Sequence, residues 1–193
     1  MSKVWIEENF FPLDIYREIV QQILSVEYVP ILPEIVPDYG KAYWFTSLLP
    51  DDCDVQKQMV KLIQEKFNII VSEWCHSLYT MIGKTAHGPR PHTDAAVGAT
   101  HNCLIYMHGE ESTNNGTGFY HKTGTGELEL SIHVGFKHNR AIFFSSDVIH
   151  GPLTWAGNGS FRYSIANFFK GHDLSKDLKA QDAKLSVGGN EAE

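Results

Sequence analysis

The sequence predicts a mainly β (α+β) fold, a double-stranded β-helix (jelly roll) with supporting helices at its N-terminus. Two observations predict it. From Ile69 onward, short runs of β-branched and aromatic residues alternate with glycines, which is the pattern of many short strands. Before Ile69, two segments carry apolar residues three and four positions apart, as amphipathic helices do. We expect these two helices to cover one sheet of the jelly roll.

The first helix is expected from Pro12 to Ser25, because Pro12 suits an early helical position. Its apolar residues lie at helical spacing: Ile15, Ile19, Ile23 and Leu24. The second helix is expected from about Asp54 to Asn68, and acidic residues at its start suit the positive end of the helix dipole. Its apolar residues share one face: Val55, Met59, Leu62, Ile63 and Phe67. Both apolar faces predict core packing rather than a cofactor site.

Strands are expected where β-branched and aromatic residues concentrate. One lies between the two helices and three lie in the second part of the chain: 41–46, 77–82, 103–107 and 141–144. The polar segment from Glu110 to Gly126 is expected to be a loop, either simply solvated or a mobile lid over a site.

At 193 residues, the chain has enough length for one domain with a hydrophobic core. We expect this domain to span 1–170, with helical support over 1–73 and the jelly-roll core over 74–170. The segment 171–193 is polar with a glycine-rich end and is expected to be a tail.

Charge and cysteine content narrow the class of protein. Lys plus Arg number 16 and Asp plus Glu number 23, a net charge of −7 that argues against nonspecific binding to nucleic acid or to an anionic membrane. Three cysteines without CxxC spacing predict reduced thiols and a cytoplasmic protein. The acidic N-terminus lacks the apolar region of a signal peptide, and no run is long enough to cross a membrane.

The segment His92-Thr93-Asp94 and the later His150 form a candidate metal site. On an extended backbone, His92 and Asp94 point to the same face, while His150 follows the strand-like run 141–144. Two histidines and one carboxylate can occupy one face of an octahedral metal and leave the opposite positions open. The other eight histidines lack a comparable arrangement, and we expect them to be structural or exposed: His76, His87, His101, His108, His121, His133, His138 and His172.

Arg162 and Ser164 form a candidate anion site on the strand that follows. A strand places both side chains on one face, and a guanidinium pairs with both oxygens of a carboxylate. Arg162 could instead form a surface ion pair, but its apolar surroundings predict burial and therefore an anionic partner. The turn 156–159 predicts a hairpin that brings Arg162 beside Leu153, about 10 Å along the strand from His150.

Taken together, these motifs resemble the Fe(II)/2-oxoglutarate-dependent oxygenases, especially the compact prolyl-hydroxylase-like branch. The resemblance runs from about Trp74 to Phe169 and includes strands on both sides of the HxD motif, the segment 116–120 and the run 139–144. It implies Fe(II) ligands and residues that bind 2-oxoglutarate, the latter through its distal carboxylate. The implied iron ligands are His92, Asp94 and His150, and the implied 2-oxoglutarate residues are Arg162, Ser164 and Tyr79.

The chain departs from the family pattern at two points. Twelve positions separate His150 from Arg162, slightly more than is usual, and collagen-type prolyl 4-hydroxylases have a lysine at the position of Arg162. The Arg-x-Ser pair is more similar to that of many small-molecule oxygenases, which argues against proline as the substrate.

The resemblance implies a dioxygenase that uses Fe(II), 2-oxoglutarate and O2. We expect it to hydroxylate an unactivated C–H of a small molecule, amino acid or peptidyl residue, with release of succinate and CO2. Two alternatives stay open: a non-catalytic sensor that binds iron and 2-oxoglutarate, and a cupin-like metal enzyme of different chemistry. Several aromatic residues could line the mouth of the site or belong to the core: Tyr39, Tyr43, Trp44, Phe119, Tyr120 and Trp155.

Overall fold

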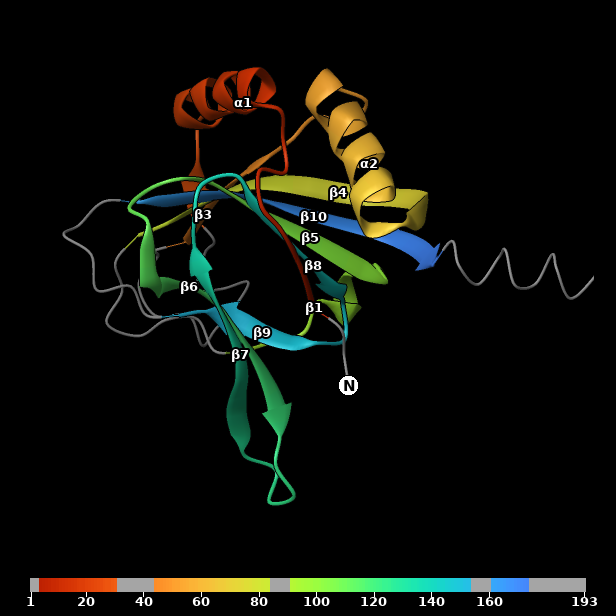
Figure 1. Cartoon of the computed structure of the whole chain (residues 1–193), viewed down its shortest axis with the longest axis vertical. Coiled ribbons are helices and arrows are strands. Elements are labelled where there is room, and N and C mark those ends of the chain that lie inside the picture. Colours follow the sequence, from red (N-terminus) through yellow and green to blue (C-terminus); the bar gives the residue numbers. More distant parts are fainter. Residues whose placement is uncertain (1–3, 31–43, 84–90, 154–160, 174–193) are drawn as a thin grey trace, which may run out of the picture.

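Two antiparallel sheets face each other, and two helices cover the outer face of the larger sheet (Figure 1). The computed structural model describes residues 4–30, 44–83, 91–153 and 161–173. The larger sheet has the strand order β1-β8-β5-β10-β4-β3-β2, and the smaller has the order β7-β6-β9. This arrangement confirms the predicted jelly roll with supporting helices.

The larger sheet draws its strands from the whole length of the chain. Its members are β1 (Val4–Glu7), β2 (Val29–Pro30), β3 (Trp44–Leu48), β4 (Ile69–Ile82), β5 (His101–His108), β8 (Arg140–Ser145) and β10 (Arg162–Asp173). The smaller sheet consists of β6 (Ser112–Lys122), β7 (Leu128–Phe136) and β9 (Ile149–Pro152). A 3-10 turn over Ala95–Val97 connects the region of His92 to β5.

The helices lie close to their expected positions. Helix α1 (Leu13–Ser25) begins directly after Pro12, and α2 (Asp54–Phe67) ends at Asn68, which adopts a left-handed conformation with φ 52°. Their buried side chains lie three or four positions apart and face the sheet: Ile19, Ile23, Met59 and Ile63. Leu24, expected on the apolar face of α1, is 47% exposed instead.

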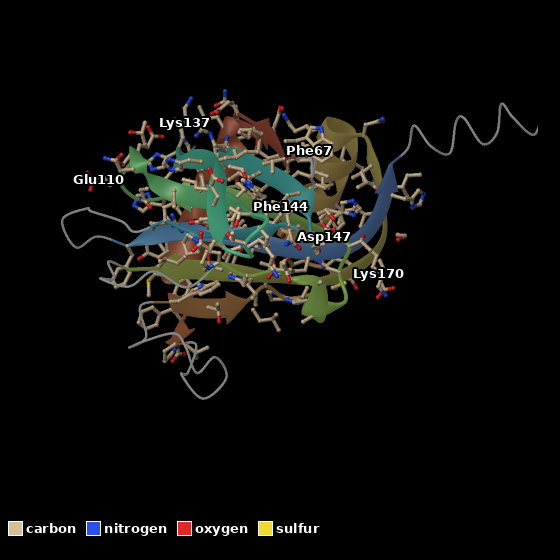
Figure 2. All side chains as sticks on the ribbon, turned by 90° about the horizontal axis from the view of Figure 1, so that it is seen from below. Phe67, Glu110, Lys137, Phe144, Asp147 and Lys170 are labelled. Atoms are coloured by element: carbon tan, nitrogen blue, oxygen red, sulfur yellow. The ribbon has the colours of Figure 1, made fainter. Side chains whose placement is uncertain are left out.

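Strand β8 explains why one short segment is apolar throughout. Ala141 and Phe143 pack against the helix side of the larger sheet, whereas Ile142 and Phe144 pack between the two sheets. A strand covered on both faces reads as a continuous apolar run. Burial of each large side chain contributes about 1.5–3 kcal/mol. Figure 2 looks from below and shows Phe144 near the centre of the molecule, with Glu110 and Lys170 at its rim.

One expectation about the organisation of the chain is wrong. The segment Glu110–Gly126 is neither a solvated loop nor a lid, because β6 fills most of it and pairs with both β7 and β9. The run of strands begins at Ile69, as expected, and β1, β2 and β3 add to the larger sheet from the part of the chain before it. At the other end, β10 continues to Asp173, past the expected boundary at 170.

The expected hairpin between His150 and Arg162 is also wrong. Its turn, 156–159, lies outside the described residues, but the strands on either side of it belong to different sheets. Strand β9 pairs with β6, and β10 pairs with β4 and β5. The chain therefore passes from one sheet to the other, and Arg162 lies across the sandwich from His150 instead of beside it on the same sheet. No helix among the described residues has the length and hydropathy needed to cross a membrane.

Candidate metal centre and anion site

The two candidate histidine ligands are held by the backbone. His92 and His150 form an isolated antiparallel bridge, in which the N–H of each residue donates to the carbonyl oxygen of the other at 2.8 and 2.9 Å. His150 belongs to β9 rather than to the end of the apolar run 141–144. This bridge brings the two imidazole rings to a centroid distance of 4.8 Å.

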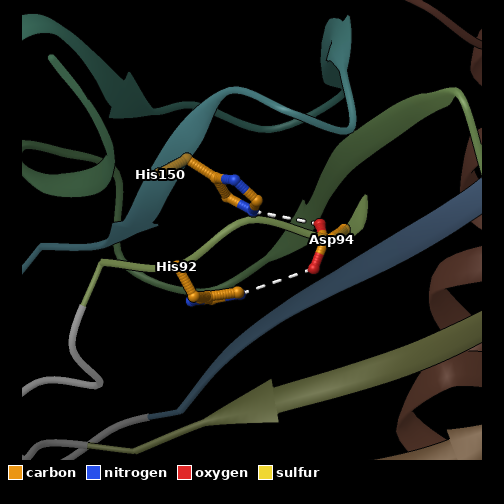
Figure 3. Close-up of side chains that lie close together, drawn as sticks. All are labelled: His92, Asp94 and His150. Atoms are coloured by element: carbon orange, nitrogen blue, oxygen red, sulfur yellow. Dashed lines mark ion pairs between the residues drawn. The ribbon is translucent and has the colours of Figure 1, made fainter. Parts of the chain in front are cut away.

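Asp94 reaches the same site from a turn. Its backbone, at φ −98° and ψ 12°, is not extended, and the residue caps the 3-10 turn Ala95–Val97. The expectation that an extended HxD segment would align His92 with Asp94 is therefore wrong in its backbone conformation, although the two side chains do meet. Asp94 Oδ1 lies 3.6 Å from His92 Nε2, and Asp94 Oδ2 lies 3.3 Å from His150 Nε2 (Figure 3).

The three side chains form a cluster suited to a metal ion. One ligand atom from each of His92, Asp94 and His150 lies within 4.8 Å of the others, and no second such group of three occurs among the described residues. Two imidazoles and one carboxylate are the facial ligand set of non-heme Fe(II) sites. The donor set therefore fits the metal that the sequence implies.

The hydrogen bond at Nδ1 leaves the other ring nitrogen of His150 facing the site. His150 Nδ1 lies 3.0 Å from the carbonyl oxygen of Val148, which can only accept a hydrogen bond, so Nδ1 is the donor. His150 Nε2 faces the Asp94 carboxylate at 3.3 Å and is the ring nitrogen available to a metal.

The ionised form of Asp94 is favoured in this environment. Burial acts to raise the pKa of its carboxyl, but His150, His92 and the Asn102 amide stabilise the anion and hold the pKa below its ordinary value. A carboxylate that stays ionised is available as a metal ligand.

Arg162 lies in the same pocket and is almost fully buried, at 3% exposure. Its Nη1 donates to Asn115 Oδ1 at 2.8 Å and to the carbonyl oxygen of Gly116 at 2.7 Å, both on β6. Its Nε has no acceptor, and no carboxylate pairs with it among the described residues. Burial lowers the pKa of the guanidinium, yet an arginine remains ionised. A buried cation with neutral partners alone is a site for an anion.

The pocket joins the two candidate sites. It is lined by His92, Asp94, His150, Arg162 and Ser164, all of which were expected to act together. Thr80 of β4 lies opposite Ser164 in the sheet and lines the same pocket, and its hydroxyl donates to the carbonyl oxygen of Ser164 at 3.4 Å. The remaining described walls are mostly apolar and include Trp44, Ile82, Leu104, Phe144, Pro152, Ala166 and Phe168.

Tyr79 does not belong to the pocket. Successive residues of a strand face opposite sides, so Thr80 faces the pocket while Tyr79 faces the helices. The Tyr79 hydroxyl donates to Gln22 Oε1 of α1 at 3.3 Å, and burial raises its pKa to about 12. The expected role of Tyr79 in binding 2-oxoglutarate is therefore wrong.

The expected aromatic mouth is only partly present. Trp44 lines the pocket, whereas Phe119 packs in the core between the sheets and Tyr120 lies outside the pocket lining. Tyr39, Tyr43 and Trp155 lie outside the described residues.

Several residues of the site were missed by sequence reasoning. Asn115, Gly116 and Thr117 appeared to be part of a polar loop, yet Asn115 and Thr117 are buried and Gly116 supplies an acceptor for Arg162. Asn102 was missed because a single asparagine in a strand carries no motif. The one available signal was a polar side chain directly before the apolar run of β5.

The fold has many relatives of known structure. The sequence itself matches no protein-family model and no curated protein. The structure is similar to the non-heme alpha ketoglutarate dependent epimerase SnoN from nogalamycin biosynthesis, with a TM-score of 0.61 and 11% identity over 89% of this chain and 78% of that chain. It is also similar to a prolyl hydroxylase from Trichoplax adhaerens in complex with a hypoxia inducible factor peptide. The TM-score is 0.61, with 14% identity over 86% of this chain and 82% of that chain.

A third similar structure is HygX from Streptomyces hygroscopicus, which contains nickel and 2-oxoglutarate. Its TM-score is 0.60, with 11% identity over 87% of this chain and 82% of that chain. At these identities the likeness establishes the fold, which is the jelly roll shared by Fe(II)/2-oxoglutarate oxygenases. What the chain does with this fold has to be argued from its own site.

Proposed function

We propose that this protein is an Fe(II)- and 2-oxoglutarate-dependent dioxygenase that hydroxylates an unactivated C–H bond and releases succinate and CO2. One observation carries the proposal. A buried guanidinium with no carboxylate partner among the described residues lines the same pocket as two histidines and an aspartate. A metal ion at the triad and a dicarboxylate between the metal and Arg162 would satisfy both sites at once.

The residues of the pocket divide the task of binding between them. His92, Asp94 and His150 would hold Fe(II) on one face and leave the opposite positions for 2-oxoglutarate and O2. Arg162 would pair with the distal carboxylate of 2-oxoglutarate, next to the hydroxyls of Ser164 and Thr80.

Iron and 2-oxoglutarate, when bound, supply the oxidising chemistry through oxidative decarboxylation of the cosubstrate. The chain contributes binding, orientation and exclusion of water. Its apolar walls, such as Ile82 and Phe168, limit the access of solvent to the reacting centre. The reaction requires no side chain as a general base.

The pocket also restricts the substrate. Apart from the histidines, Asp94 and Arg162 are the charged side chains among its described lining residues, because burial keeps the Cys103 thiol neutral by raising its pKa, and both already have a role in the proposed site. We therefore expect the reacting part of the substrate to be uncharged, as part of a small molecule, an amino acid or a peptide. The three cysteines are free, which agrees with a cytoplasmic location.

The residues of the pocket also bear on the two alternative functions, a cupin-like metal enzyme and a non-catalytic sensor. A cupin-like metal enzyme of different chemistry would have no use for a buried dicarboxylate site at Arg162. A non-catalytic sensor would bind iron and 2-oxoglutarate but would not release succinate. Since this fold also serves the epimerase SnoN, the mass of the product separates hydroxylation, which adds an oxygen atom, from a reaction that leaves the composition unchanged.

The test is succinate formation by the iron-loaded protein under air, with 2-oxoglutarate and a panel of amino acids, peptides and small metabolites. We expect slow release of succinate without a substrate and faster release with the right one. The variants His92→Ala, Asp94→Ala and His150→Ala should each abolish it, because the facial ligand set is already minimal. Iron and 2-oxoglutarate binding without any succinate would support the sensor instead.

A further inference from the structure

Asp94 is the candidate metal ligand that lies outside the backbone bridge between His92 and His150. His92 and His150 are held by their reciprocal backbone hydrogen bonds. Asp94, in contrast, precedes a single 3-10 turn that ends at Gly98, with φ +81°. A side chain on so short a turn is oriented mainly by the groups that it contacts.

Those groups are Asn102 and Ser146. Asn102 of β5 is 3% exposed, and its Nδ2 donates to Asp94 Oδ2 at 2.6 Å. Its Oδ1 accepts a hydrogen bond from Ser146 Oγ at 3.1 Å. The carbonyl oxygen of Ser146 in turn accepts from the backbone N–H of Asp94 at 2.9 Å. The three residues form a closed ring of hydrogen bonds that fixes both the backbone and the carboxylate of Asp94.

The chemistry of these groups defines the orientation of the amide. A carboxylate only accepts hydrogen bonds, so Nδ2 of Asn102 must face Asp94, and Oδ1 is left to accept from the Ser146 hydroxyl. Oδ2 of Asp94 is thereby held by Asn102, and the carboxylate faces both histidines, with Oδ1 3.6 Å from His92 Nε2 and Oδ2 3.3 Å from His150 Nε2.

We propose that Asn102 is a positioning residue for the metal centre, which holds the Asp94 carboxylate in the orientation that faces His92 Nε2 and His150 Nε2. The inference rests on the proposed metal centre. A carboxylate that is free to rotate would turn away from the two histidines for part of the time. The hydrogen bond from Asn102 Nδ2 limits this rotation and would keep the carboxylate ready to bind the metal.

The direct test is the variant Asn102→Leu, which keeps the size of the side chain and removes the donor. Fe(II) affinity is measured by anaerobic equilibrium binding to the full chain. We expect a loss of about 10- to 100-fold, the usual effect of removing a hydrogen bond to a metal ligand. The visible charge-transfer band of the anaerobic Fe(II)–2-oxoglutarate complex should also shift, because the ligand field of the metal changes. A loss of packing alone would not move this band.

Asn139→Ala is the matched control. Asn139 is also a buried asparagine, and its side chain makes two hydrogen bonds of 2.9 Å to the backbone of Phe11, outside the lining of the pocket. Its removal should lower the melting temperature and leave Fe(II) affinity and the band unchanged. Ser146→Ala is the second variant, which removes the support of Asn102 and should weaken Fe(II) binding in the same direction by a smaller factor.

The outcomes separate this inference from the proposed function. Failure of the wild type to bind Fe(II), or unchanged binding in Asp94→Ala, would overturn the metal centre itself. If the wild type binds and Asp94→Ala does not, wild-type affinity and an unshifted band in Asn102→Leu contradict the role of Asn102. Should Asn102→Leu fail to fold, Ser146→Ala decides, and wild-type affinity in that variant contradicts the role as well.

Discussion

At the scale of single residues, the proposed anion site depends on Arg162. Its guanidinium is buried, remains ionised and donates to two neutral acceptors, Asn115 Oδ1 and the Gly116 carbonyl oxygen. These contacts orient the planar group without neutralising its charge. The remaining donors are therefore available for a carboxylate ligand, which would be poorly solvated and would pair strongly.

We predict that Arg162→Leu raises the KM for 2-oxoglutarate steeply and leaves Fe(II) binding intact. Loss of the partner of a desolvated carboxylate costs roughly 2–5 kcal/mol, which corresponds to a rise of about 30- to 5,000-fold. Succinate release at increasing 2-oxoglutarate measures the effect. Arg140→Leu is the control, because Arg140 pairs with Glu8 and does not line the pocket. An unchanged KM in Arg162→Leu would place the carboxylate elsewhere.

Residues could be predicted from the sequence where a short motif holds them together. His92 with Asp94, and Arg162 with Ser164, are each two positions apart, and the structure places all four in one pocket. Asn102 could not be predicted, because its contact with Asp94 depends on the packing of a strand against a turn. Tyr79 was assigned to the site, but it is the alternate residues of β4, Thr80 and Ile82, that face the pocket. No local sequence pattern in β4 indicates which of its two faces points to the pocket and which to the helices.

At the scale of elements, β6 connects the anion site to the smaller sheet. Gly116 has φ +148°, and a Cβ at this position would collide with the backbone carbonyl oxygen of Val134 on β7. The close approach of the two strands places the Gly116 carbonyl within reach of Arg162 Nη1 and of the backbone N–H of Leu153. The polar composition of this strand, with its two inward-facing residues Asn115 and Thr117, is the reason that it resembled a loop.

The variant Gly116→Ala should destabilise the fold and weaken 2-oxoglutarate binding together. The new side chain must displace β6 from β7, at a cost of more than about 1 kcal/mol, and the carbonyl that orients Arg162 moves with the strand. Urea unfolding and the KM for 2-oxoglutarate measure the two effects. Gly124→Ala, in the turn between the same strands, has open space around its Cβ and should stay within about 0.5 kcal/mol of the wild type. If Gly116→Ala and Gly124→Ala showed the same stability and the same KM, the close approach of β6 and β7 at Gly116 would be contradicted.

Helix α1 is attached to the sheet in part by two tyrosines. Tyr16 donates to the carbonyl oxygen of Met107, and Tyr79 donates to Gln22 of α1. Burial raises the pKa of each hydroxyl to about 12. Glu111 adds to this effect at Tyr16, and Cys53 adds to it at Tyr79. Because the folded state prefers the neutral form, their contribution to stability is complete below about pH 10 and is lost as the pH rises toward 12.

We therefore predict that the free energy of unfolding falls between about pH 10 and pH 12, and that it falls less in the double variant Tyr16→Phe/Tyr79→Phe. Urea unfolding at several pH values measures the slope. The same double variant should keep the wild-type KM for 2-oxoglutarate, since Tyr79 faces the helices. A raised KM, or a slope equal to that of the wild type, would contradict this assignment of the tyrosines.

At the scale of the whole molecule, the pocket is built from both sheets. Arg162 and Ser164 come from β10 of the larger sheet, and His150 comes from β9 of the smaller one. Short β-branched and aromatic runs broken by glycines predicted the jelly roll, and apolar residues at helical spacing predicted the two helices. The pairing of strands was not predictable, because the crossing between β9 and β10 depends on contacts far apart in the chain.

A site between two sheets implies that its ligands stabilise the sandwich. We predict that Ni(II) together with 2-oxoglutarate raises the melting temperature, and that a chelator reverses the effect. A ligand at 100 times its Kd contributes about 2.7 kcal/mol, which corresponds to about 5–10 °C for a chain of this size. His150→Ala should show no such shift, because it lacks a metal ligand. A wild type that melts at the same temperature with and without the ligands would contradict a site that joins the sheets.

The central claim is that one pocket binds a metal ion and a dicarboxylate that contacts both the metal and Arg162. The most direct measurement is an anaerobic titration of 2-oxoglutarate into the Fe(II)-loaded protein, followed by the visible charge-transfer band of the chelate. The account predicts that the band saturates with 2-oxoglutarate in the wild type and that it is absent without iron and in Asp94→Ala. In Arg162→Leu, the band should saturate only at a 2-oxoglutarate concentration about 30-fold or more above that of the wild type. Iron-loaded wild type without a band, or with a band whose titration is unchanged in Arg162→Leu, would contradict it.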